Sequence, residues 1–152
     1  MTLRPVQPFE KDNFRMNRTL RAFALLALML PGHAAVASNL PPLIEDSHIT
    51  GEFVAAAVGD EIRQNCPTIS ARVFVVLGRI NELGSYARGR GYTDDQIKAF
   101  RESRANKDEL NRRRDAYLAQ NGVVAGDAES YCRLGRREIE AGSRIGTLLR
   151  SR

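Results

Sequence analysis

Histidine and cysteine, which supply many catalytic and metal-binding groups, are scarce in this chain, with two of each. His33 lies in a segment that we expect to be removed, so His48 is the only histidine left to the mature protein. A histidine metal site or a Ser-His-Asp triad would depend on this residue, which follows the Pro41-Pro42 pair. We interpret His48 as a surface residue and predict no catalytic residue, no metal and no cofactor.

A long hydrophobic run is also missing. The longest uncharged apolar segment, Ala22–Leu30, has nine residues, whereas a membrane-spanning helix needs about 20. Arg18 and Arg21 precede this segment, and Ala35-Val36-Ala37 follows it as a small-residue cleavage site. These features are typical of a secretory signal peptide. We therefore expect residues 1–37 to be removed and the protein to be periplasmic or secreted.

Three segments make up the predicted domain organisation. Residues 1–37 form the signal peptide, and Met16 is an alternative start because a cleaner basic segment begins there. Residues 38–48 contain Pro41-Pro42, which favours an extended arm. Residues 49–152 are of a size that fits a single domain.

The positive charge of the chain is concentrated in its first part. The whole chain carries a net charge of +5, but only 18 basic and 16 acidic residues follow residue 37. A domain that binds nucleic acid should keep its excess charge in the folded part. The sequence therefore does not favour nucleic acid as a partner.

Period-two alternation, the mark of half-buried strands, is not found, whereas helical periodicity recurs along the chain. We predict an all-α fold, a small bundle of four main helices plus a short C-terminal helix. The expected helices cover residues 50–65, 70–90, 94–120, 127–141 and 144–150.

Several positions define the ends and faces of these helices. Thr50 and Asp127 are the expected N-caps of the first and fourth helices, and Thr93 with Gln96 forms a capping box at the third. A break in the third helix is an open alternative near residues 103–106. The second helix is expected to face inward with Val73, Val76, Leu77, Ile80, Leu83 and Ala87.

Cys66 and Cys132 are predicted to form a disulfide, because an even number of cysteines in an exported chain favours pairing. A redox pair would more often be C-x-x-C, and a metal site would need further ligands nearby. The bridge requires the first and fourth helices to pack side by side. The predicted contacts join Phe53, Val58 and Ile62 to Tyr131 and Ile139. Without the bridge, the cysteines would be separate buried residues.

Arginine is abundant, and two groups of it form a candidate surface for an anionic partner such as lipid headgroups or an acidic protein face. The alternative is an ordinary solvated face, because acidic residues such as Asp108 and Glu138 are interleaved with the arginines. The sequence favours this alternative. The candidate residues are Arg112, Arg113, Arg114, Arg133, Arg136 and Arg137.

Four stretches carry a resemblance to a known family: residues 65–72 (NCPTISAR), 91–94 (GYTD), 131–135 (YCRLG) and 143–150 (SRIGTLLR). With these residues the chain resembles a domain-of-unknown-function family of small exported proteins from alphaproteobacteria. The resemblance covers the expected mature chain. It implies a periplasmic location and a Cys66–Cys132 pair, and a weaker association places such proteins beside respiratory-complex genes.

Two classes of function remain from the sequence. The first is a non-enzymatic structural or interaction protein of the periplasm, with a protein partner, accessory to a membrane complex of the respiratory kind. The second is a small hydrolase or ligand-binding module that uses acidic residues on helix faces. The first is favoured, because no set of polar groups converges in the sequence.

Overall fold

The computed structural model describes residues 40–152. The predicted signal peptide, residues 1–37, and the alternative start at Met16 lie outside the described residues. The described chain is mainly helical, with one small antiparallel sheet. In order, its elements are η1 (Leu43–Glu45), α1 (Ser47–Asn65), β1 (Ile69–Ala71), α2 (Val73–Gly89), α3 (Asp94–Glu102), α4 (Arg104–Gln120), α5 (Ala128–Ala141), η2 (Gly146–Leu148) and β2 (Leu149–Ser151).

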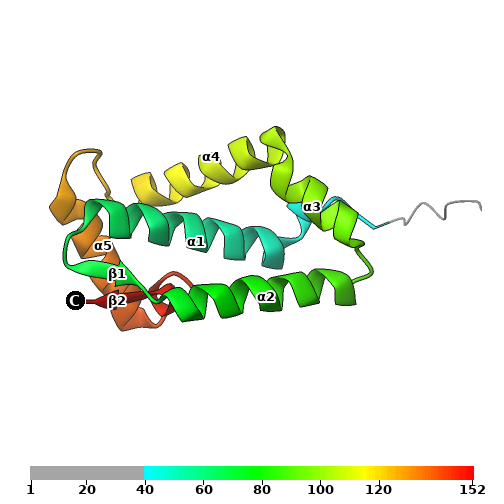
Figure 1. The fold of residues 1–152 in the computed structure, drawn as a ribbon. Coiled ribbons are helices and arrows are strands. Elements are labelled where there is room, and N and C mark those ends of the chain that lie inside the picture. Colours follow the sequence, from blue (N-terminus) through cyan, green and yellow to red (C-terminus); the bar gives the residue numbers. More distant parts are fainter. Residues whose placement is uncertain (1–39) are drawn as a thin grey trace, which may run out of the picture. The chain divides into compact units, whose positions relative to one another are not determined.

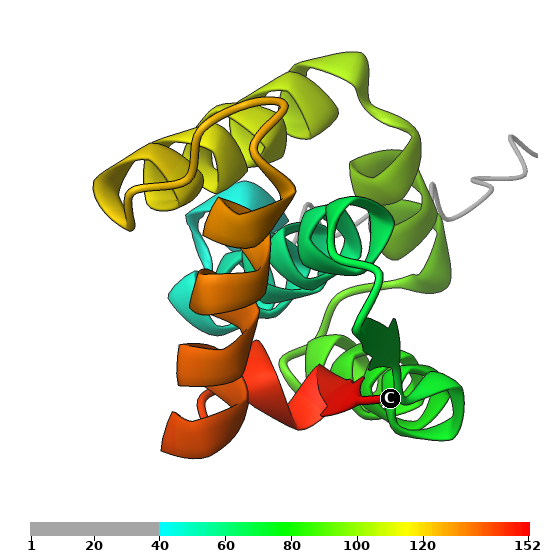
Figure 2. The ribbon, with the colours of Figure 1, turned by 90° about the vertical axis from the view of Figure 1, so that its left-hand side faces the viewer.

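Helix α1 is the central element of this arrangement. It contacts α4 and α5 closely and α2 much less, and Figure 1 shows it lying between α4 and α2. Figure 2, turned by 90°, shows α5 running across the direction of α1. Because α1 is surrounded in this way, it has to bury two different faces.

Each buried face of α1 belongs to a separate hydrophobic cluster. The disulfide core joins α1 to α5 and the two strands; its buried members are Ala55, Val58, Ile62, Cys66, Ile69, Leu118, Tyr131, Cys132, Leu134, Ile145 and Leu149. The N-terminal core joins α1 to η1, α2 and α3; its buried members are Leu43, Ile49, Ala87, Tyr92 and Phe100.

The predicted packing of the first helix against the fourth is confirmed for most of its residues. Val58, Ile62 and Tyr131 are buried in the disulfide core, and Ile139 packs against it. Phe53 was placed wrongly in this contact. It lies instead against the N-terminal core, where its ring meets the Phe100 ring edge-on at a centroid distance of 5.3 Å.

The cysteines are paired as predicted. The Cys66–Cys132 disulfide joins the end of α1 to α5, with 5.1 Å between the two α-carbons, inside the usual range of about 4.4–6.8 Å. Gly135 allows this approach, because a β-carbon there would lie 2.6 Å from Ile62 Cγ2. Both cysteines are buried.

The helix ends are formed largely by the predicted residues. Gln96 N–H donates to Thr93 Oγ1 over 3.2 Å while Thr93 N–H donates to Gln96 Oε1 over 2.8 Å, so the capping box is confirmed. Asp127 caps α5 by accepting from Glu129 N–H over 3.1 Å. The break in the expected third helix is real and occurs at Ser103, which caps α4.

The start of α1 differs from the prediction. Asp46, not Thr50, is its N-cap, and its carboxylate accepts hydrogen bonds from the backbone N–H groups of His48 and Ile49. The expected arm is therefore shorter and partly structured, because η1 precedes Asp46. The Tyr92 hydroxyl donates a 2.6 Å hydrogen bond to the Pro41 carbonyl and so holds this part of the arm.

The short C-terminal helix expected over residues 144–150 is replaced by the single turn η2 and then the strand β2. β2 pairs with β1 so that Ser70 lies opposite Arg150 and Ala71 opposite Leu149. This pairing gives β2 hydrogen-bond partners while the Leu149 side chain enters the disulfide core. Residues 70 and 71, expected to open the second helix, are in β1.

The interpretation of the second helix is wrong at three of its six inward positions. Val73, Leu77 and Ile80 are 60%, 52% and 55% exposed, and only Ala87 in this helix is buried. The reason is tertiary: α1 buries its two faces mostly against other elements, so α2 lies beside it with few contacts. An apolar face of α2 remains in solvent.

Reducing the disulfide, or changing Cys132 to Ser, should destabilise the protein by about 2–5 kcal/mol. The bridge closes a loop with a sequence separation of 66 residues, for which the chain-entropy model gives about 4.4 kcal/mol. Denaturant unfolding with and without reductant measures this difference.

The double variant Cys66→Ser/Cys132→Ser is the control, and it should lose as much stability as the single variant. Two reactive thiols per chain in the unreduced, unfolded protein would contradict the bridge.

Candidate interaction surface

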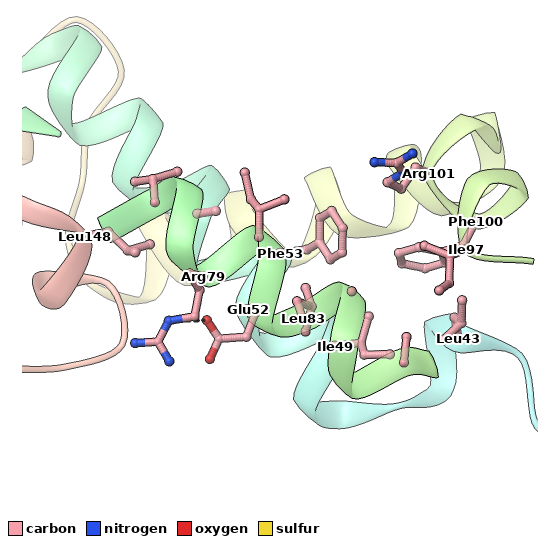
Figure 3. A pocket seen from close by; sticks show the side chains of 15 residues that line it. Leu43, Ile49, Glu52, Phe53, Arg79, Leu83, Ile97, Phe100, Arg101 and Leu148 are labelled. Atoms are coloured by element: carbon pink, nitrogen blue, oxygen red, sulfur yellow. Dashed lines mark ion pairs between the residues drawn. The ribbon is translucent and has the colours of Figure 1, made fainter. Parts of the chain in front are cut away.

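An apolar groove lies between α1 and α2 on the described surface and is closed at one end by α3. Its cavity volume is about 280 Å³, nearly twice that of the ~150 Å³ engineered cavity that binds benzene. Side chains from three helices line it, and most of them are apolar (Figure 3). They include Phe53, Val76, Ile80, Leu83, Ile97 and Phe100.

The groove continues toward the β1–β2 sheet as a second apolar hollow of about 170 Å³. Ala56, Val76 and Leu148 line both hollows. The lining residues of α2 thus extend from Val73 to Ala87, a distance of about 21 Å at 1.5 Å per residue. The site is therefore an elongated apolar trough rather than a closed pocket.

Three charged residues line the first of these two hollows: Glu52, Arg79 and Arg101. Glu52 is only 5% exposed, and Figure 3 shows its carboxylate directed toward the Arg79 guanidinium. Arg101 has no ion-pair partner at 4 Å or less within residues 40–152, and its side chain is exposed. The end of the groove near α3 therefore carries an uncompensated positive charge.

Glu52 connects α1 to α2 and to the loop that follows α5. Its Oε1 lies 3.1 Å from Nε of Arg144, and its Oε2 lies 3.7 Å from Nε of Arg79. The second distance is too long for a hydrogen bond, and Oε2 is buried with no hydrogen-bond partner. A β-carbon at Gly51 would meet the Arg144 guanidinium, so glycine leaves room for the present position of that side chain.

Arg144→Ala should destabilise the protein by about 1–3 kcal/mol, because it leaves the buried Glu52 carboxylate without its closer partner. Glu52→Met should destabilise the protein less, because it removes the buried charge and leaves the half-exposed Arg79 and Arg144 free to be hydrated. Thermal or urea unfolding of the two variants compares these effects.

The double variant Glu52→Met/Arg144→Ala should be more stable than Arg144→Ala alone. Equal losses of stability for Glu52→Met and Arg144→Ala would contradict the conclusion that the unpaired, buried Glu52 carboxylate causes the loss.

A second buried carboxylate, Glu138, fastens α5 to α4. The Tyr117 hydroxyl donates to Glu138 Oε1 over 2.6 Å, and the Ser143 hydroxyl donates to Oε2. Ser143 Oγ also accepts from the Gly146 N–H over 2.9 Å. Desolvation and the hydrogen bond to Glu138 raise the pKa of Tyr117 to about 12. These groups hold elements together, and Ser143 is oriented by a carboxylate and not by a histidine.

The raised pKa of Tyr117 predicts a loss of stability at alkaline pH. The folded state holds the phenol proton more tightly than the unfolded state, whose pKa is near 10.0. This contribution is complete below pH 10 and should disappear as the pH rises toward 12. Urea unfolding midpoints across this range measure it.

Tyr117→Phe is the matched control, because it removes only the hydroxyl. Its stability should fall less steeply between pH 10 and 12 than that of the unsubstituted protein. Parallel curves would mean that the hydroxyl does not carry the effect.

The arginines of the candidate anionic-partner surface are distributed over two helices. Arg112 and Arg113 on α4 pair with Glu109, and Arg114 pairs with Glu61 and Asp115.

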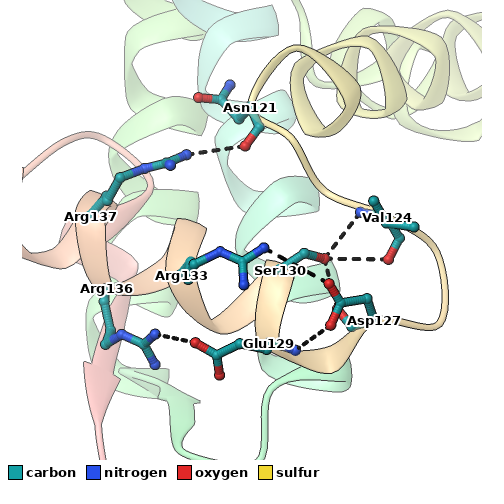
Figure 4. Close-up of polar contacts among 8 residues, drawn as sticks. All are labelled: Asn121, Val124, Asp127, Glu129, Ser130, Arg133, Arg136 and Arg137. Atoms are coloured by element: carbon teal, nitrogen blue, oxygen red, sulfur yellow. Dashed lines mark hydrogen bonds and ion pairs between the residues drawn. The ribbon is translucent and has the colours of Figure 1, made fainter.

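On α5 the three arginines have partners of their own (Figure 4). Arg133 lies 3.8 Å from Asp127, Arg136 lies 2.5 Å from Glu129, and Arg137 donates to the Asn121 carbonyl over 3.2 Å. Five of the six candidate arginines therefore have carboxylate partners, which favours a solvated face.

His48 is the remaining candidate for catalytic or metal-binding chemistry in residues 40–152. His48 packs against Tyr86, with 4.4 Å between the ring centroids. Within this part of the chain no three His, Cys, Asp or Glu side chains are grouped so that they could hold a metal ion. None of its helices is long and apolar enough to cross a membrane.

The structure therefore defines a small, disulfide-linked helical domain with an exposed apolar trough. Residues 41–150 match the model of a family of unknown function (DUF5333), and the chain belongs to this family. No curated protein and no solved structure matches the chain.

Sequence reasoning missed the groove, because it assigned the exposed positions of α2 to the core. One signal was available. Val73, Val76, Ile80, Leu83 and Ala87 follow an alternating spacing of three and four residues, which is the seam of a helix that packs along another helix. The spacing shows that α2 has an apolar seam, but not whether the partner lies in the same chain.

Proposed function

We propose that this protein is an exported, non-enzymatic interaction protein that receives an amphipathic helix of a partner protein in the groove between α1 and α2. The observation that carries the proposal is the exposed apolar seam of α2 beside that groove. Large exposed apolar patches on a soluble domain mark interaction sites. Export rests on the sequence of residues 1–37 and agrees with the disulfide, since such bridges persist in oxidising compartments.

The shape of the groove favours a helix as occupant. A trough about 21 Å long accommodates about four turns of helix, and an amphipathic helix would place its apolar side chains between those of α1 and α2. Arg101 supplies charge complementarity, because an acidic residue at the matching end of the helix would pair with it. An accessory role at a membrane complex, of the respiratory kind, is the setting that we propose for this partner.

A ligand-binding role is the second candidate, and Glu52 is the observation that favours it. This acid lies on a helix and lines a cavity large enough for an apolar group. Its position next to Arg79 would orient a polar end of such a ligand. The hydrolase version of this candidate would likewise use acidic residues on helix faces.

Ile80→Arg should abolish capture of the partner, because it places a charge in the apolar seam of α2. Ile80 is 55% exposed, so the substitution should leave the fold intact. The measurement is a pull-down from periplasm and detergent-solubilised membranes, with the amount of each captured protein compared between variants.

Val124→Arg is the matched control, since Val124 is 60% exposed and does not line the groove. A stoichiometric membrane-complex partner that is lost with Ile80→Arg and retained with Val124→Arg supports the proposal. Equal capture by both variants contradicts it. An apolar small molecule bound without any protein partner favours the second candidate.

A further inference from the structure

The β1–β2 pairing brings together arginines that are far apart in the sequence. Ser70 lies opposite Arg150 in the register, and the backbone N–H of Arg152 donates to the Thr68 carbonyl. Ile69 and Leu149 are buried on the inner face of this sheet. Because neighbouring strand residues point to opposite faces, Ser70, Arg150 and Arg152 share the outer face.

Arg72 extends this basic group toward α2. It directly follows β1, its backbone N–H donates to the Leu148 carbonyl, and its guanidinium donates to the Thr147 carbonyl over 3.4 Å. Arg72, Arg150 and Arg152 are all exposed. We call these three residues the basic edge.

The basic edge differs in its partners from the arginines on α4 and α5. Arg150 donates to Ser70 Oγ and Arg152 to the Pro67 carbonyl, each over 3.3 Å, and the acceptor of Arg72 is also a neutral oxygen. No side-chain carboxylate of residues 40–152 forms an ion pair with any of the three. Their charges are therefore available to an external anion, whereas most of those on α4 and α5 are compensated.

An apolar projection follows the basic edge along the chain, at the start of α2. Phe74, two residues after Arg72, is 90% exposed, and Val73 and Leu77 on the same helix are more than half exposed. A protruding ring next to unpaired guanidiniums is the combination that binds the interface of an anionic bilayer. The ring enters the headgroup region while the arginines contact phosphates.

We propose that the basic edge and Phe74 dock this protein on an anionic lipid bilayer. This surface is separate from the part of the groove tested by Ile80→Arg, and the inference does not depend on the proposed protein partner. The fold positions the two parts of this surface, because the β1–β2 register places Arg150 opposite Ser70, three residues before the start of α2.

The test is co-sedimentation of residues 38–152, which include both hydrophobic cores and the disulfide, with vesicles of phosphatidylcholine with and without phosphatidylglycerol. We expect binding to the anionic vesicles at low salt and release as salt rises. Arg72→Gln/Arg150→Gln should weaken partitioning about fivefold for each arginine. Phe74→Ser should weaken it about tenfold.

The control Arg112→Gln/Arg113→Gln removes the same charge from α4 and should change partitioning much less. Circular dichroism and melting curves verify that each variant is folded. Absence of binding by the unsubstituted protein, or equal loss in the control, would overturn the proposal. Full binding by Phe74→Ser would indicate an anion site alone and would also overturn it.

Discussion

The burial of α1 on several sides is the constraint on which the rest of this structure depends. Val58 and Ile62 are completely buried, and they are held in the disulfide core, while Phe53 on another side of the same helix packs against the N-terminal core. The elements that cover α1 most closely are α4 and α5. Because those contacts and the disulfide already fix α1, α2 can remain beside it without closing the groove.

The charged side chains around α1 differ from those near the groove and the basic edge in whether they are paired. Glu138 with Tyr117 joins α5 to α4, and Glu52 with Arg144 joins α1 to the loop after α5. At the groove and at the basic edge, by contrast, Arg101 and Arg150 have no carboxylate partner among the described residues. Unpaired charge and exposed apolar surface thus occur together around α2, which is where we place both interaction surfaces.

The sequence predicts helix ends correctly where a few neighbouring residues decide the structure. The capping box of Thr93 and Gln96 and the cap at Asp127 need only side chains within three residues of the helix start. The break at Ser103 has the same origin. The first cap was misplaced, because Thr50 and Asp46 both suit that role and the choice depends on how η1 packs before α1.

By itself the sequence determined the helical class, the pairing of Cys66 with Cys132 and the family, because periodicity, cysteine count and motif spacing are properties of the chain alone. Only the tertiary structure decided which side of α2 is exposed and that residues 149–151 form a strand. An apolar face is equally apolar whether it meets its own core or a partner. Whether the apolar face of α2 is buried or exposed depends on how much of α1 the other elements cover.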